Sequence, residues 1–154
     1  GAAAAHYHSP LGPAADAAMR AAWRDLTDGA EGEPRDIPVG ARTLRVPRMA
    51  DRVAWAEFED LCGEAHAAAD YLALAQAADT LLLEGVPHLT RERYDAARRF
   101  VMLIDVLYEA KRRLILSAAA EPEALYAEGA GAFEFARTAS RLEEMRRADW
   151  PAAD

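Results

Sequence analysis

The sequence predicts an α/β fold, because two compact apolar segments flank a long amphipathic one. Residues 80–83 and 112–117 are short apolar runs, which are typical of strands buried on both faces of a sheet. Residues 90–110, for which Thr90 is a suitable N-cap, repeat apolar side chains at the helical spacing of Tyr94, Ala97, Val101, Ile104 and Tyr108. A strand, a helix and a strand in this order form a βαβ unit with parallel strands.

The first third of the chain predicts a helix followed by an inserted β-hairpin. Residues 13–26 carry apolar groups at helical spacing, and Pro13 suits a first helical position. After an acidic connector, alternation in residues 35–39 and 42–46 around Gly40 and Ala41 predicts the hairpin. Val53 and Trp55 indicate a third short strand, which Phe58 would continue.

Two further helices complete the expected set. Residues 67–78 are rich in alanine, which has the highest helix propensity, and carry Tyr71, Leu72 and Leu74. Residues 134–147 place Phe135, Ala139, Leu142 and Met145 on one face and glutamates and arginines on the other. We therefore expect an N-terminal tail, or the edge of a cut fragment, over residues 1–12, and one α/β unit over residues 13–154.

Composition narrows the class of protein. The chain has 154 residues and a formal net charge of −8, which opposes sequence-independent nucleic-acid binding. Its apolar runs are far shorter than the roughly 20 residues of a membrane-spanning helix. Cys62 is the only cysteine, and the four histidines lack the spacing of a zinc site. We expect a cytoplasmic protein with no transmembrane segment, no nucleic-acid partner and no metal held by its own residues.

The sequence contains some, but not all, of the residues that nucleotide hydrolysis requires. No glycine-rich loop precedes the only lysine, Lys111, so a phosphate-binding Walker A motif is absent from the sequence. Glu84 follows the apolar run 80–83, where nucleotide hydrolases place a carboxylate that binds magnesium or polarises water. Ser117 ends the next strand, where such folds place phosphate-sensing side chains. The alternatives are a solvent-facing acid before a turn for Glu84 and a turn cap for Ser117.

Two arginines form the richest polar pattern. Arg137 and Arg141 are four residues apart, so they project from the same face of the predicted last helix. Paired guanidinium groups suit a phosphate or a carboxylate, because each offers planar paired donors. The alternative is pairing with Glu134 and Glu144 on an exposed face.

The same helix carries a recognisable signature. Residues 133–145, FEFARTASRLEEM, resemble the closing motif of the ZapE-type cell-division ATPases, an AFG-type AAA+ family. The segments 98–109, RRFVMLIDVLYE, and 114–122, LILSAAAEP, are similar to the helix, strand and loop that precede this motif in the family. Upstream, SPLGP at 9–13, FEDLC at 58–62 and DYLA at 70–73 follow in the family's order, so the resemblance covers residues 7–150.

The resemblance implies a P-loop NTPase-like, AAA+-type fold of which this sequence is the C-terminal part. It implies ATP and Mg²⁺ as cofactors of the intact protein, with neither bound tightly by this chain alone. By analogy, Arg137 or Arg141 is a candidate arginine finger or nucleotide sensor. The implied partner is a protein of the division machinery, and a homo-oligomer is possible.

Two functions from different classes follow. The first is the arginine-bearing part of an ATPase that is inactive without the missing phosphate-binding loop. The alternative is a free-standing α/β protein-interaction module without nucleotide activity. A thermal-shift assay with Mg-ATP separates these two hypotheses.

Overall fold

The protein is built on one six-stranded mixed sheet. The computed structural model describes residues 5–126 and 132–152, without the side chains of residues 132 and 133. The strand order is β1-β6-β5-β4-β3-β2. The strands are β1 (Tyr7–His8), β2 (Glu33–Val39), β3 (Arg42–Ala50), β4 (Val53–Glu57), β5 (Thr80–Val86) and β6 (Arg113–Ala118).

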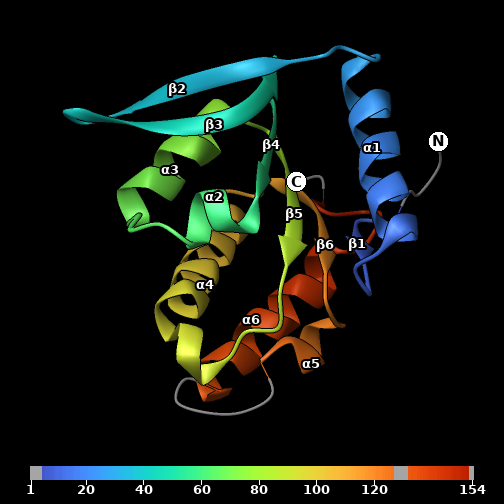
Figure 1. Cartoon of the computed structure of the whole chain (residues 1–154), viewed down its shortest axis with the longest axis vertical. Helices are drawn as coiled ribbons and strands as arrows, with labels where there is room; N and C mark the ends of the chain where they lie inside the picture. The colour runs from blue at the N-terminus through green and yellow to red at the C-terminus, as the bar shows by residue number, and fades with distance from the viewer. Residues whose placement is uncertain (1–4, 127–131, 153–154) are drawn as a thin grey trace.

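Helices cover both faces of this sheet. They are α1 (Pro13–Thr27), α2 (Phe58–Cys62), α3 (Ala68–Ala77), α4 (Tyr94–Glu109), α5 (Pro122–Leu125) and α6 (Ala132–Met145), with a 3-10 turn, η1 (Arg91–Arg93), before α4. Helix α1 lies on one side, and α3, α4 and α6 lie on the other (Figure 1). The arrangement is a three-layer α/β fold, as the sequence predicts.

The predicted βαβ unit is confirmed. Strands β5 and β6 pair in parallel with Leu81 opposite Leu114 and Leu83 opposite Leu116, and α4 connects them. Strands β4 and β1 extend the parallel part on either side. The hairpin of β2 and β3 then adds antiparallel strands at the other edge. The fold is therefore the α/β, P-loop NTPase-like arrangement with an inserted hairpin.

Several boundaries differ from the predicted ones for local reasons. Phe58 does not continue β4 but begins α2, because Asp60 accepts a hydrogen bond from the Glu57 amide at 2.9 Å and caps a short helix there. Thr90 makes no side-chain cap, and the η1 turn precedes α4. Tyr7 and His8, in the expected tail, form the edge strand β1.

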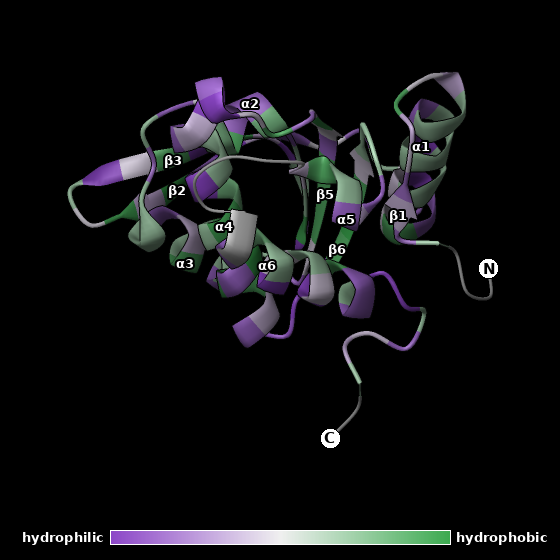
Figure 2. Cartoon of the chain, turned by 90° about the horizontal axis from the view of Figure 1, so that it is seen from below, coloured by the Kyte–Doolittle hydropathy of each residue, from purple (hydrophilic) through white to green (hydrophobic). Residues whose placement is uncertain are grey.

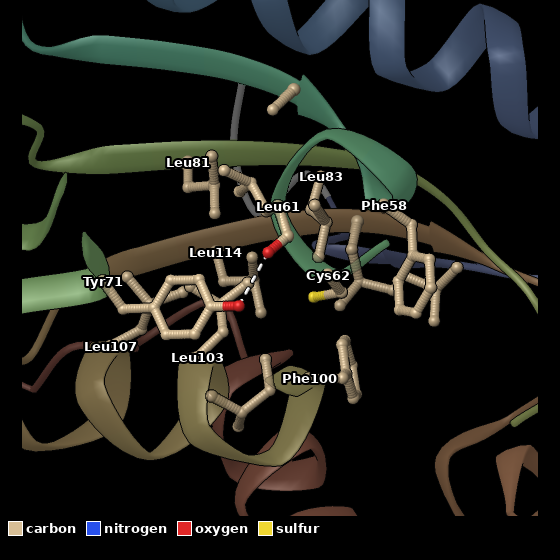
Figure 3. Packing of buried hydrophobic residues seen from close by; sticks show 14 of the residues in the cluster. Phe58, Leu61, Cys62, Tyr71, Leu81, Leu83, Phe100, Leu103, Leu107 and Leu114 are labelled. Atoms are coloured by element: carbon tan, nitrogen blue, oxygen red, sulfur yellow. Dashed lines mark hydrogen bonds between the residues drawn. The ribbon is translucent and has the colours of Figure 1, made fainter. Parts of the chain in front are cut away.

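The larger hydrophobic core lies between the sheet and α2, α3 and α4. Figure 3 shows Leu81, Leu83 and Leu114 of the sheet facing Leu103 and Leu107 of α4. In the same core, the Tyr71 hydroxyl donates a hydrogen bond to the Leu61 carbonyl at 2.6 Å, which satisfies the polar group of a fully buried ring.

A smaller core forms under α1. Met19 and Trp23 of this helix pack on Leu82 and Ile115, whose side chains point to the opposite face from their neighbours in β5 and β6. Both faces of the central strands are thus buried, which explains their uninterrupted apolar sequence.

Candidate functional site

Arg137 and Arg141 lie on α6, which packs against α4. Helix α6 buries an apolar row and exposes a polar one, and the buried residues include Phe135, Leu142 and Met145. The two arginines therefore share one face, as their spacing predicts. The side chain of Phe133, which opens the motif, lies outside the described residues.

Arg141 is held on three sides. Its Nη1 binds the Oδ1 atom of Asp105, and its Nη2 lies 3.4 Å from the Oε1 atom of Glu109. Its guanidinium carbon lies 4.6 Å from the centre of the Tyr108 ring, a cation–π contact. With 20% of its side chain exposed, Arg141 is a structural link between α6 and α4.

Arg137 is held much more loosely. Its Nη2 lies 3.5 Å from the Oδ2 atom of Asp105, and 65% of its side chain is exposed. Because Arg141 already binds the other oxygen of Asp105, this carboxylate is shared between two cations. The arrangement leaves the Arg137 guanidinium available to an anion from outside the chain.

Tyr108 and Trp150 hold the C-terminal end of α6. Their rings stack with centroids 5.1 Å apart, and the Tyr108 hydroxyl donates a hydrogen bond to the Oε2 atom of Glu144 at 2.6 Å. This hydrogen bond raises the pKa of Tyr108. The contacts hold the face that carries both arginines at a defined position on α4.

Glu84 lies in a separate cleft, between α1 and the sheet. Strand β5 continues past the predicted end to Val86, and Glu84 sits opposite Glu57 of β4. The cleft, of about 460 Å³, is lined by Asp16, Arg20, Pro47, Arg48, Trp55, Ala56, Glu57, Asp60 and Glu84.

The Glu84 carboxylate accepts a hydrogen bond from the Trp55 indole at 3.0 Å. Partial burial raises the pKa of Glu84; this hydrogen bond opposes the shift, while the carboxylates of Asp16 and Glu57 add to it. Sequence reasoning missed this cleft, although the alternation of β4 placed Trp55 and Glu57 on the same side.

Ser117 is fully buried, and its hydroxyl is already engaged. It accepts a hydrogen bond from the backbone amide of Gly85 at 2.9 Å. Gly85 has a φ of +78°, at a register shift between β5 and β6. Ser117 and Glu84 are thus neighbours through Gly85, whereas Arg137 and Arg141 contact α4; the structure does not bring the two pairs together.

The candidate residues differ in how accessible their polar groups are. Across 5–126 and 132–152, no group of three histidine, cysteine, aspartate or glutamate side chains could hold a metal ion. The Ser117 hydroxyl is buried and occupied, and Arg141 is bound by carboxylates. Of the four candidate residues, Arg137 has the charged group that is most exposed at the surface, with 65% of its side chain exposed.

The mostly parallel sheet with helices on both faces defines a three-layer α/β protein, which is consistent with the expected P-loop NTPase-like fold. The family model for AFG1-like ATPases matches residues 2–153, and the chain belongs to this family.

Individual relatives agree with this assignment. The chain is 32% identical over 142 residues to the cell division protein ZapE of Escherichia coli, covering 92% of this chain and 38% of that protein. It is 32% identical over 145 residues to lactation elevated protein 1 homolog B of Danio rerio, covering 93% of this chain and 29% of that protein. An uncharacterized protein of Schizosaccharomyces pombe is 34% identical, with 75% of this chain and 32% of that protein covered.

The chain therefore spans about a third of the length of these relatives. No solved structure matches it. None of the helices in the described part of the chain is long and apolar enough to cross a membrane.

Proposed function

We propose that this chain is the C-terminal part of a ZapE-like AAA+ ATPase, which binds and hydrolyses ATP with Mg²⁺ in the intact protein and acts in cell division. The family match over residues 2–153 supports the ATPase class. The identity to the E. coli cell division protein supports the cellular process.

The role of this part is to supply a cation to a nucleotide held elsewhere. The observation that carries the proposal is the difference between the two arginines. Arg141 is bound by Asp105 and Glu109. Arg137 is 65% exposed, and its one contact with the shared Asp105 carboxylate among the described residues is long, at 3.5 Å. A guanidinium that is free to move onto a phosphate stabilises charge developing on the transferred phosphoryl group. We therefore assign the role of arginine finger or nucleotide sensor to Arg137, and Arg141 positions helix α6.

The chain alone is inactive in this proposal. It has no glycine-rich loop before a lysine, so backbone amides that would cradle the phosphates are missing. In this proposal Glu84 and Ser117 act only on a nucleotide that other residues bring to the carboxyl ends of the strands.

The similarity to a cell division protein and the net charge support a cellular setting for the proposed function. We place the protein in the cytoplasm, with a partner in the division machinery and with copies of itself as possible neighbours. The net charge of −8 disfavours nucleic acid as a partner.

The experiment is complementation in trans. Intact subunits carrying Arg137→Ala are mixed with subunits that lack the phosphate-loop lysine, and ATP turnover is measured against each variant alone. If Arg137 acts on a neighbouring subunit's nucleotide, the mixture regains turnover that neither variant has. If the mixture stays inactive, Arg137 does not act in trans. If the unmixed Arg137→Ala protein keeps full turnover, Arg137 is not the finger.

A further inference from the structure

Strand β1 is a very short strand at the edge of the sheet. It pairs with β6 in parallel, with Tyr7 opposite Leu116 and His8 opposite Ser117. The Leu116 amide donates a hydrogen bond to the His6 carbonyl at 2.9 Å. Figures 1 and 2 both show β1 beside α1 at the rim of the sheet, next to β6, which Figure 2 colours as hydrophobic. A two-residue edge strand is a segment that can open without unfolding of the core.

Tyr7 anchors this strand. Its side chain is buried, and its hydroxyl donates a hydrogen bond to the Ala120 carbonyl at 2.6 Å. The guanidinium carbon of Arg146 lies 4.8 Å from the centre of the Tyr7 ring, a cation–π contact. Arg146 is itself paired with Glu121 at 2.7 Å and with Glu143 at 2.9 Å. These two carboxylates therefore already have a cation.

His6 precedes the anchor in surroundings that disfavour a positive charge. Its Nδ1 atom is buried and has no hydrogen-bond partner in the described part of the chain, and the same holds for the Nε atom of Arg113. Burial lowers the pKa of His6, and a hydrogen bond to the backbone of Met145 opposes this shift. The charges of Arg113 and of His8 lower the pKa of His6 further.

His8 follows the anchor and is in a similar position. Burial lowers the pKa of His8, a hydrogen bond to the backbone opposes the shift, and the charge of Arg146 lowers the pKa further. Glu121 lines the cleft beside His8, but Arg146 and the Ser9 hydroxyl already bind this carboxylate. As for His6, the charged groups that shift the pKa are cations.

We propose that residues 5–8 form a pH-sensitive strap, which is held on β6 while His6 and His8 are neutral and is released when they are protonated. Protonation of either ring places a positive charge in a partly buried position beside an arginine, and release returns that charge to water. Release also uncovers the edge of β6 at Ser117, a candidate residue that is fully buried while the strap is closed. The strap requires no nucleotide, so its release can be tested independently of the proposed ATPase function.

The direction of the pH dependence follows from the two states of the strap. In the released segment the histidines have an ordinary pKa of about 6.5, whereas in the closed strap their pKa values are lower. The released state therefore binds protons more readily as the pH falls. The strap is held fully well above about pH 6.5 and is progressively weakened below this pH, down to the closed-state pKa values.

Native-state hydrogen exchange at the Leu116 amide measures the release. This amide donates to the His6 carbonyl, so it exchanges when the strap opens. After correction for the intrinsic effect of pH on exchange, its protection should fall about tenfold from about pH 7.5 to about pH 5. The exchange should depend little on urea, because opening a two-residue strand exposes little surface. Protection that does not fall with pH, or a urea dependence as steep as that of the amides of residues 81–83 in β5, would overturn the proposal.

Substitution of the histidines tests their role. The double variant His6→Gln/His8→Gln has no charge at these positions at any pH, so its Leu116 protection should change by less than about twofold over the same pH range. His88→Gln, at an exposed histidine after β5, is the matched control and should keep the wild-type fall. A double variant that also keeps this fall would show that other groups drive it, and would reject the strap.

The ring signals of the histidines in nuclear magnetic resonance spectra give a readout that needs no variant. In the folded chain, His6 and His8 should titrate below the pKa of about 6.5 that applies in the urea-unfolded chain. Titration of both rings at or above that value would overturn the proposal, even if the double variant fails to fold. Neither result bears on ATP turnover, so the strap and the proposed function can fail separately.

Discussion

Arg42 binds both carboxylate oxygens of Asp70, and the Asp70 side chain is completely buried. Arg42 begins β3 and Asp70 lies in the first turn of α3, so the pair ties the inserted hairpin to the helix that covers it. The Oδ2 atom of Asp70 also accepts a hydrogen bond from the Ala67 amide at 2.8 Å, which caps the helix. One buried carboxylate therefore fixes both the start of α3 and the position of the hairpin.

Replacing Arg42 should destabilise the protein. Arg42→Ala leaves the Asp70 carboxylate buried without its cation, which is unfavourable because a desolvated charge needs a partner. We expect the melting temperature to fall by about 5 °C. Arg45→Ala is the control, because Arg45 pairs with Asp36 at 3.3 Å with both side chains more than half exposed, and such pairs contribute little. Equal falls for the two variants would show that burial of Asp70 does not matter.

The same pair predicts a pH dependence. The hydrogen bonds from Arg42 lower the pKa of Asp70 below that of an aspartate in the unfolded chain, which is about 3.9. The unfolded state then binds the proton more readily, so this contribution is complete above about pH 3.9 and is lost as the pH falls toward the folded-state pKa.

Urea unfolding from pH 7 to pH 3 measures this contribution. The stability difference between wild type and Asp70→Asn should be constant at neutral pH and shrink below about pH 4. A difference that is unchanged down to pH 3 would mean that Asp70 has an ordinary pKa.

Replacing Ser117 should lower the stability of the protein, because the Ser117 hydroxyl binds the Gly85 amide. Ser117→Ala removes the acceptor of the Gly85 amide at the register shift between β5 and β6, and a partly buried donor left unpaired costs about 1–2 kcal/mol in unfolding free energy. Ser140→Ala, at an exposed position on α6, should change stability by less than about 0.5 kcal/mol. Chemical denaturation of both variants provides the comparison. If Ser117→Ala is as stable as wild type, the hydroxyl does not hold the strand.

The sequence was sufficient to predict the elements whose apolar residues follow a clear pattern. The apolar runs of β5 and β6 and the period of α4 predict the parallel core, because a strand buried on both faces leaves no polar alternation. The hairpin of β2 and β3 follows from alternation around Gly40. Each of these elements is long enough for its apolar pattern to be visible.

Short elements and tertiary contacts could not be predicted from the sequence. Strand β1 has two residues, Tyr7 and His8, which is too short to show a period. The extension of β5 beyond Leu83 includes Gly85, whose amide is bound by the hydroxyl of Ser117, 32 residues away in the chain. The spacing of Arg137 and Arg141 placed both on one face, but only the position of Asp105 on α4 shows that they differ in freedom.

That difference gives the prediction on which the functional proposal depends. In the intact ATPase, Arg137→Ala should lower ATP turnover by about 10³-fold, because a finger acts on the transition state, and should leave the Kd for ATP comparatively unchanged. The melting temperature should hardly move, since the Arg137 side chain is 65% exposed and its ion pair with Asp105, among the described residues, is as long as 3.5 Å.

Arg141→Ala should show the converse pattern, because it leaves the carboxylates of Asp105 and Glu109 without the cation that joins α6 to α4. We expect a lower melting temperature, with any loss of turnover following the loss of folded protein. Arg137→Lys sharpens the comparison: it keeps the charge but lacks the planar paired donors, so a finger role predicts little recovery of turnover, whereas a general electrostatic role predicts near-complete recovery. Turnover that is unchanged in both alanine variants and in the double variant would reject the finger assignment, and the α/β unit would then be better explained as an interaction module.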